Sequence, residues 1–175
     1  MSNYGGYFMD KRYLIIIFII FFCGIDLFFV ANNSEMVGKA SVDFDNYTFS
    51  VPRDYSLMNT FDTFVQIYNP NLGYLAFGYN DSANYTQSLE IINNKSNQKI
   101  LSNGTINVDN ITIYSIYFES IDDSNVSTNR SYFFFNKYGH SFKISMVGFN
   151  YDDDRNKTID VIEEIVGSLR HNKKV

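Results

Sequence analysis

The sequence has few of the residues that form covalent cross-links, metal centres and nucleophilic active sites. Its 175 residues include one cysteine, two histidines, two prolines and no tryptophan. The cysteine, Cys23, lies in an apolar segment near the N-terminus, so the rest of the chain can form no disulfide of its own and depends on a hydrophobic core. The sequence contains neither a cysteine pair nor a His-Glu-X-X-His motif, so it encodes no recognisable zinc site.

Positive charge is also scarce. Lysine and arginine number 14 against 19 aspartates and glutamates, which gives a formal net charge of −5 at pH 7. A nucleic-acid partner requires a basic surface that neutralises its phosphates, so this balance argues against such a partner. Hydrophobic residues make up 45% of the chain, too many for a disordered protein, and the length suits one folded domain.

A long apolar segment near the N-terminus is the strongest signal in the chain. Tyr13 to Ile25 carries no charge, and after Asp26 the apolar character resumes, so that residues 13–31 span nineteen positions. A membrane-spanning helix needs about 17–25 such residues. Lys11 and Arg12 directly precede the segment, and the positive-inside rule therefore keeps the N-terminus cytoplasmic and places the rest outside.

A cleaved signal peptide and a buried core helix are the alternatives to a membrane anchor. The apolar length fits a signal peptide and Ala31 suits its cleavage site, but the bulky Phe29 stands two positions earlier. A start at Met9 would give such a peptide a conventional short basic beginning. A core helix would lack the polar face of a soluble helix. We favour the anchor, because Asp26 lies near the outer end, where its carboxylate can reach the headgroups.

An outward location gives meaning to a set of N-glycosylation acceptor motifs. Residues 32–175 hold 20 asparagines and 24 serines or threonines. Chance placement would give roughly three Asn-X-Ser/Thr motifs. Period-two polarity in strands is an alternative origin for Asn46 and Asn110. We predict that some of the motifs are glycosylated. The ten acceptors are Asn32, Asn46, Asn80, Asn84, Asn94, Asn103, Asn110, Asn125, Asn129 and Asn156.

Short runs of β-branched and aromatic residues, bounded by Asn, Asp, Gly and Pro, predict strands after residue 40. The run 111–120 is apolar on both faces, so it is expected to be covered on both sides. The fold class is α+β, a single mostly antiparallel sheet of about seven strands flanked by helices. The seven predicted strands are 41–44, 47–51, 64–68, 74–79, 111–120, 131–138 and 141–149, and 99–101 is a candidate for a further brief strand. Turns are predicted at 103–104 and 139–140, and helices at 82–93 and 155–170.

The last helix is the best specified element. Ile159, Ile162, Val166 and Leu169 recur at helical spacing and predict its inner stripe. Aspartates precede it and basic residues follow it, as the helix dipole favours. The predicted organisation is a cytoplasmic segment 1–12, a transmembrane helix 13–31, a tether 32–40, an outer domain 41–170 and a basic tail 171–175.

The order of these segments resembles a known family. "DNYTFSVPRDY" at Asp45 to Tyr55, a hairpin, a helix, "ITIYSIYFES", "SYFFFNKYGHSFKISM" and a terminal "IDVIEEIVGSLR" resemble the PsbP-like, or Mog1/PsbP, α/β/α sandwich over about residues 41–170. The whole chain resembles short membrane-anchored surface proteins of methanogenic archaea that carry such a domain. The resemblance implies non-enzymatic adaptor, assembly or binding roles, and it implies no fixed set of active-site residues.

Few residues are candidates for chemistry. His140 falls in a predicted turn and His171 in the basic tail, and no Gly-X-Ser-X-Gly motif is present. A run of three aspartates, 152–154, with Asp122 and Asp123, offers oxygen ligands for calcium, but the spacing is not that of an EF-hand. We therefore expect a helix start and an acidic loop there, and no metal or cofactor.

Tyrosines are the remaining candidates. Their rings suit a binding face, although they could equally line the core with their hydroxyls at its rim. The seven are Tyr68, Tyr74, Tyr79, Tyr114, Tyr117, Tyr132 and Tyr138.

The sequence thus predicts a non-enzymatic binding or assembly module of the cell surface, anchored in the membrane through residues 13–31 and binding a protein or envelope partner. If the anchor is cleaved, the module is secreted. One alternative is an extracellular hydrolase of envelope glycans, for which Glu119 and Asp122 are the acids to test. The other is a structural surface glycoprotein.

Overall fold

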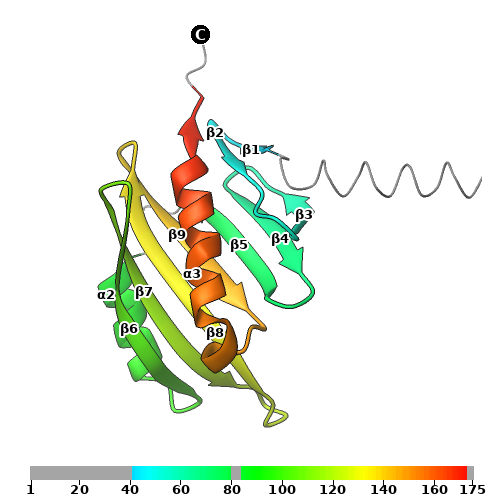
Figure 1. Ribbon diagram of the computed structural model, residues 1–175. Coiled ribbons are helices and arrows are strands. Elements are labelled where there is room, and N and C mark those ends of the chain that lie inside the picture. The colour runs from blue at the N-terminus through cyan, green and yellow to red at the C-terminus, as the bar shows by residue number, and fades with distance from the viewer. Residues whose placement is uncertain (1–40, 80–83, 173–175) are drawn as a thin grey trace, which may run out of the picture. The chain divides into compact units, whose positions relative to one another are not determined.

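The computed structural model describes residues 41–79 and 84–172, and one long antiparallel sheet runs through most of them (Figure 1). Its seven strands lie in the order β3-β4-β5-β9-β8-β7-β6, and every neighbouring pair is antiparallel. The strands are β3 (Ser56–Thr60), β4 (Phe64–Asn69), β5 (Gly73–Tyr79), β6 (Gln98–Val108), β7 (Ile111–Ile121), β8 (Ser127–Lys137) and β9 (His140–Val147).

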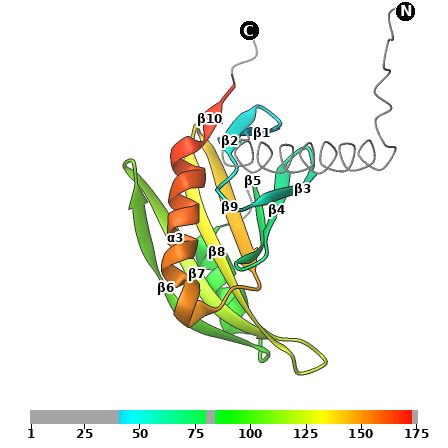
Figure 2. The same ribbon diagram turned by 45° about the vertical axis from the view of Figure 1, so that its right-hand side comes forward.

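Two helices cover opposite faces of this sheet. Helix α3 (Tyr151–Ser168) crosses the face toward the viewer in Figure 1, and the shorter α2 (Tyr85–Asn93) lies behind β6 and β7. Figure 2 shows the same arrangement turned by 45° about the vertical axis. This arrangement confirms the α+β class, the mostly antiparallel sheet and the covering of β7 on both faces. The predicted membrane helix 13–31 lies outside the described residues, among which no helix is long and apolar enough to cross a membrane.

A second, three-stranded sheet was not predicted. Its order is β1-β2-β10, with β1 (Ser41–Phe44), β2 (Tyr47–Ser50) and β10 (Arg170–His171). Strand β10 has only two residues, too short for any alternating pattern, and it forms because Arg170 pairs with Thr48 and His171 with Tyr47. The start of the predicted basic tail is therefore a strand.

Two other elements differ from the prediction because long-range pairing outweighs local turn signals. Strand β6 continues through Asn103-Gly104, where a turn was predicted, since it pairs with β7 over almost its whole length. The turn lies instead at Asp109-Asn110, where both residues have positive φ, 47° and 65°. Strand β3 has no alternating apolar pattern, and all five of its residues are exposed.

The main core fills the space between the large sheet, α3 and the small sheet. Phe77 on β5 is fully buried and contacts rings from both sheets. Its ring centroid lies 5.2 Å from that of Phe44, 5.0 Å from that of Phe49 and 5.8 Å from that of Phe142. Phe77 therefore links the small sheet to the large one. A smaller core lies under α2, formed by Ile92, Ile116, Phe118 and Phe134.

Three of the four residues predicted for the apolar stripe of α3 are buried and Ile159 is half-buried, while strand β8 supplies part of the C-terminal cap. Ile162, Val166 and Leu169 are fully buried. Lys137 donates from Nζ to the carbonyl oxygens of Val166 (2.8 Å) and Leu169 (3.1 Å). Arg170, one of the basic residues expected at this end, donates to the Gly167 carbonyl at 2.7 Å. Because Lys137 lies far from α3 in the sequence, its part in the cap could not be predicted from helical spacing.

Candidate binding face

The face of the large sheet opposite α3 is covered only in part. Helix α2 packs on β6 and β7, and next to them the same face of β8, β9, β5 and β4 presents half-buried or exposed side chains. We call this part of the sheet the open face. It consists of Phe64, Gln66, Tyr68, Tyr74, Ala76, Gly78, Arg130, Tyr132, Lys143, Ser145 and Val147.

Strand register arranges these side chains in three rows across the sheet. Opposed residues in antiparallel strands point to the same face, so each row can be followed from strand to strand. In one row Arg130 faces Val147, which faces Tyr74, which faces Tyr68. The next row is Tyr132, Ser145, Ala76 and Gln66. The third row is Lys143, Gly78 and Phe64, and on β8 it continues to Phe134, which belongs to the core under α2.

The open face carries two cations and no acid. Lys143 Nζ lies 3.6 Å from the ring centroid of Tyr132 and 5.6 Å from that of Phe134, and burial lowers the pKa of this lysine. The Nε of Arg130 is buried and has no hydrogen-bond partner among the described residues. This part of an acidic protein is therefore positive, and its arginine retains an unused donor.

Aromatic rings border a small groove on the same face. Tyr74 is 54% exposed, and its ring centroid lies 4.8 Å from that of Tyr68. A cavity of about 200 Å³ lies between Phe64 and Lys143, with Gly78 among the small residues that line it. A Cβ at Gly78 would lie 2.4 Å from the carbonyl oxygen of Thr63 and 2.5 Å from the Cβ of Phe64, so the close approach of the chain at these two residues requires glycine.

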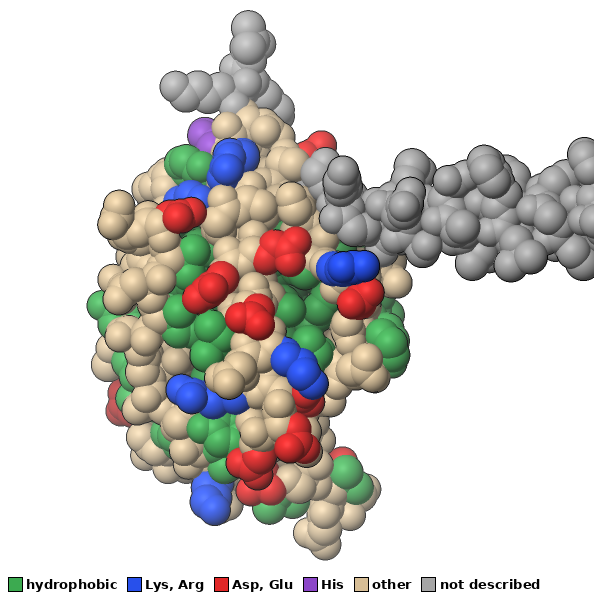
Figure 3. Space-filling model, in the orientation of Figure 1, with side chains coloured by type: hydrophobic (Ala, Val, Ile, Leu, Met, Phe, Trp, Pro, Cys, Tyr) green, Lys and Arg blue, Asp and Glu red, His purple; other side chains and the backbone are tan. Residues whose placement is uncertain are grey.

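The opposite face of the molecule differs in charge. Acidic side chains gather along the outer surface of α3 in Figure 3. The exposed ones are Asp152, Asp153, Asp160, Glu163 and Glu164. The two faces of the sheet layer would therefore attract partners of opposite charge.

The seven candidate tyrosines divide between the two expected roles. Tyr68, Tyr74 and Tyr132 belong to the open face. Tyr117 is a core residue whose hydroxyl lies 3.2 Å from Thr158 Oγ1, and Tyr114 is 45% exposed beside α2. Tyr79 and Tyr138 pack against the ring of Tyr47. The open face, which includes three of the seven tyrosines, is the candidate binding site. The spacing of tyrosines in the sequence could not show which three lie on this face.

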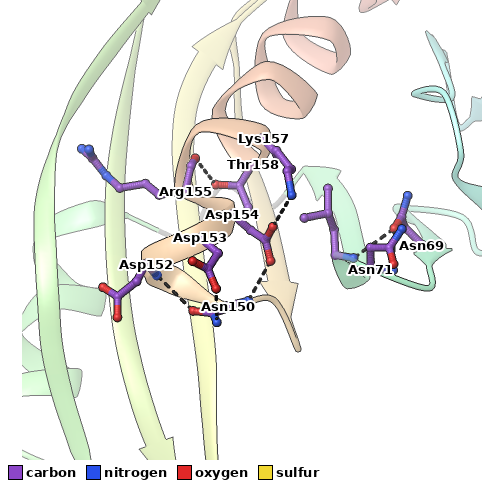
Figure 4. Close-up of polar contacts among 10 residues, drawn as sticks. Asn69, Asn71, Asn150, Asp152, Asp153, Asp154, Arg155, Lys157 and Thr158 are labelled. Carbon is purple, nitrogen blue, oxygen red and sulfur yellow. Dashed lines mark hydrogen bonds and ion pairs between the residues drawn. The ribbon is translucent and has the colours of Figure 1, made fainter.

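The aspartate run that was considered for calcium forms the start of α3 (Figure 4). The helix begins at Tyr151, so Asp152, Asp153 and Asp154 lie within its first turn and not before it. Asn150 caps the helix, and its Nδ2 donates to Asp153 Oδ2 at 2.7 Å. No group of three or more Asp, Glu, His or Cys that could hold a metal ion occurs among residues 41–79 and 84–172.

Asp154 is buried at the start of α3 and is hydrogen-bonded through both of its carboxyl oxygens. Its Oδ1 accepts a hydrogen bond from Lys157 Nζ at 2.7 Å, and its Oδ2 accepts one from the Asn150 backbone N–H at 3.2 Å. The Lys157 bond is the main reason that the pKa of Asp154 is lowered. Since the folded state prefers the ionised carboxyl, its stabilisation is complete above the ordinary carboxyl pKa and is lost as pH falls through the lowered one.

Asp154→Asn is therefore expected to decrease the free energy of unfolding at neutral pH by on the order of 1 kcal/mol. Thermal denaturation of both proteins from neutral pH down to about pH 2.5 measures this. The difference should shrink as the solution becomes more acidic, whereas Asp160→Asn, at an exposed position of the same helix, should change little. A difference that stays constant with pH would contradict the assigned role.

The candidate catalytic residues have structural partners instead. The rings of His140 and His171 lie 6.0 Å and 5.1 Å from that of Tyr47. Glu119 accepts a hydrogen bond from the Ser127 hydroxyl and lines an open cavity of about 530 Å³, which Asp122 does not line. Asp122 Oδ1 accepts from the Val126 backbone N–H at 2.9 Å and so closes the turn between β7 and β8.

The predicted glycosylation acceptors among the described residues lie on other surfaces than the open face. Asn32 and Asn80 fall outside the described residues. Of the other eight, Asn46 and Asn129 are half-buried and six are exposed, and none belongs to the open face. The exposed acceptors are Asn84, Asn94, Asn103, Asn110, Asn125 and Asn156.

Comparison with known proteins identifies the fold. No family model matches the sequence, and no curated protein matches it. The structure is similar to the Ran-binding protein Mog1p of Saccharomyces cerevisiae, with a TM-score of 0.50 at 10% identity over 75% of this chain and 94% of that chain. A protein of Bacteroides thetaiotaomicron gives a TM-score of 0.50 at 10% identity over 74% of this chain and 46% of that chain, so the match spans about half of its length.

Cyanobacterial PsbP from Synechocystis gives a TM-score of 0.47 at 10% identity, over 73% of this chain and 87% of that chain. The predicted Mog1/PsbP-type fold is thus confirmed, on the strength of the Mog1p and Bacteroides similarities. An identity of 10% shows the fold alone.

Proposed function

We propose that residues 41–170 form a non-enzymatic binding module, held on the outside of the cell membrane by residues 13–31, and that its open face binds the partner. The proposal rests on the composition of the open face. This face has aromatic rings, two cations and a groove, and none of the described glycosylation acceptors lies on it. A glycan on such a face would block access to it. A binding role therefore explains why the eight described acceptors lie elsewhere.

The charges of the open face favour an acidic protein partner. Arg130 and Lys143 would face its carboxylates. The rings of Tyr68 and Tyr74 supply the large, rigid contact surface that is common at protein interfaces. Mog1p, which shares the fold, is by its name a protein that binds another protein.

The arrangement of acids supports binding over hydrolysis. A glycoside hydrolase needs two carboxyl groups facing each other across one cleft, about 5–10 Å apart. Glu119 is the only acid among the described residues that line its open cavity, and Asp122 is used in a turn. These positions favour a binding module over a hydrolase of envelope glycans.

Site-specific photo-crosslinking in membranes of the source cells tests the proposal. A photoreactive phenylalanine analogue replaces Tyr74 on the open face or, as the matched control, Glu163 on the outer surface of α3, in the full chain. Both positions are exposed, so both probes are accessible. We expect a discrete crosslinked partner from position 74 and none from position 163. Equal crosslinking from both positions, or from position 163 alone, would contradict an open-face site.

A further inference from the structure

A second cavity, of about 660 Å³, lies beside the N-terminal end of α2. Its volume is in the range of small-molecule sites. The rings of Tyr85, Tyr114 and Phe134 form part of its lining, and no charged residue occurs among its described lining residues. Its polar groups are amides and hydroxyls, those of Asn84, Thr86, Asn110, Thr112, Asn136 and Ser141.

This combination of groups suits a neutral sugar. A pyranose ring presents C–H groups on its faces and hydroxyl groups at its edge. Aromatic rings accommodate the apolar faces, whereas amide and hydroxyl side chains both donate and accept hydrogen bonds at the edges. A charged ligand would find no counter-ion in the described lining.

Two glycosylation motifs meet at this cavity. Asn84 with Thr86, and Asn110 with Thr112, are the acceptor and hydroxyl residues of two separate Asn-X-Thr motifs, and all four line it. The two motifs are far apart in the chain, and the fold brings them together. An asparagine that is glycosylated at the rim of this cavity would carry a sugar that the cavity can hold.

The geometry favours Asn110 as the point of attachment. Asn110 is exposed in the turn before β7, and Thr112 and Tyr114 follow on one face of that strand, about 7 Å apart by strand rise. A glycan on Asn110 would thus extend past Thr112 toward the ring of Tyr114, which is 45% exposed and lies 5.2 Å from the ring of Tyr85.

Asn84 has a different role at the same rim. Its Oδ1 accepts a hydrogen bond from the Gln87 backbone N–H at 2.7 Å and caps α2. The cap fixes this side chain and does not use Nδ2, which can therefore donate to a sugar hydroxyl.

We infer that an N-linked glycan on Asn110 lies in this cavity with its first sugars stacked on Tyr114. This inference rests on the proposed outward location. The linkage forms when Nδ2 of Asn110 bonds to C1 of a sugar carried on a lipid phosphate. The bond from C1 to the phosphate oxygen breaks, the lipid phosphate leaves with the bonding pair, and the transferase takes the amide proton. The sugar then covers an aromatic surface that would otherwise face water.

A mutant cycle tests the inference. The full chain is produced in a host that attaches N-linked glycans with an N-acetylglucosamine core, and its glycans are the probe. Melting temperatures are compared for the wild type, Asn110→Gln, Tyr114→Ser and the double variant. We expect Asn110→Gln to lower the melting temperature by about 2–6 °C, and to have much less effect when Tyr114 is already serine.

Two controls isolate the sugar. The same four proteins made in a host without N-glycosylation should show no coupling between positions 110 and 114. Any strain that glutamine introduces in the left-handed turn is present in both hosts, so a coupling seen only in the first host comes from the sugar. Asn125, an exposed acceptor at φ 59° in another turn, gives the matched control. Asn125→Gln should have the same effect with or without Tyr114.

Peptide mapping of the native protein by mass spectrometry separates the two possible failures. Sugar on Asn110 together with coupling to Tyr114 supports the inference. Sugar on Asn110 without coupling, or sugar only on other acceptors, overturns it and leaves the outward location standing. A native chain without sugar on any acceptor would overturn both this inference and the support that the acceptors give to an outward location.

Discussion

Replacing Phe77 by alanine is expected to lower the free energy of unfolding by about 3–5 kcal/mol. The ring is fully buried, and it contacts Phe44 and Phe49 of the small sheet as well as Phe135 and Phe142 of the large one. Its removal leaves a cavity that these rings can fill only by moving together. Since domains of this kind are stable by about 5–15 kcal/mol, the loss would be a large fraction of the total.

Equilibrium denaturation in urea measures the effect of Phe77→Ala. The midpoint should fall without a change in slope if the two sheets unfold together. Ile91→Ala provides the control, because Ile91 is 53% exposed on α2 and its truncation should change stability by less than about 0.5 kcal/mol. If Phe77→Ala cost no more than the control, the ring would not be the link between the two sheets.

Gly73→Ala is the second substitution with a large expected effect. Gly73 begins β5 at φ +75°, and an added Cβ would lie 2.1 Å from the carbonyl oxygen of Val147 on β9. That contact is with backbone, so relief requires the strands to separate where Tyr74 pairs with Val147. The preceding turn is held by Asn69, whose Oδ1 accepts the backbone N–H groups of Asn71 and Leu72 (Figure 4).

A matched glycine separates the clash from the backbone strain. Gly139 has φ +82° and no heavy atom within 4 Å of a built Cβ, so Gly139→Ala should cost only the left-handed penalty of about 1–2 kcal/mol. Gly73→Ala should cost that amount plus the clash, on the order of 3 kcal/mol or more in total. Urea denaturation of both variants gives the comparison. Equal losses would show that β5 and β9 do not approach as closely as described.

Local periodicity was enough to predict the elements that bury an apolar stripe. The apolar residues on both faces of β7 predicted its covering from two sides, because alternation is read within one strand. The stripe of α3 was predicted for the same reason, although the helix starts earlier, at Tyr151. Strands β3 and β10 were missed, since pairing with distant segments and not their own pattern makes them strands.

The open face could be predicted only in part, because it is formed by pairing between segments far apart in the chain. The neighbours Tyr74 and Val147 illustrate this, since β5 and β9 are separated by α2 and three strands. The tyrosines were candidates from composition, but Arg130 and Lys143 gave no local signal. Only the register of β8, β9 and β5 places both cations among the rings. The cavity beside α2 could not be predicted for the same reason, because only the fold brings the glycosylation motifs at Asn84 and Asn110 together.

The most direct test of binding at the open face is to measure the crosslinking yield from position 74 after the two positive charges of that face have been removed. Arg130→Gln combined with Lys143→Gln should lower the yield about tenfold or more, since carboxylates of the partner lose both cations. Lys95→Gln combined with Lys99→Gln alters the net charge equally at exposed positions elsewhere and should leave the yield unchanged. An unchanged yield in the first pair, or an equal loss in both pairs, would contradict binding of an acidic partner at the open face.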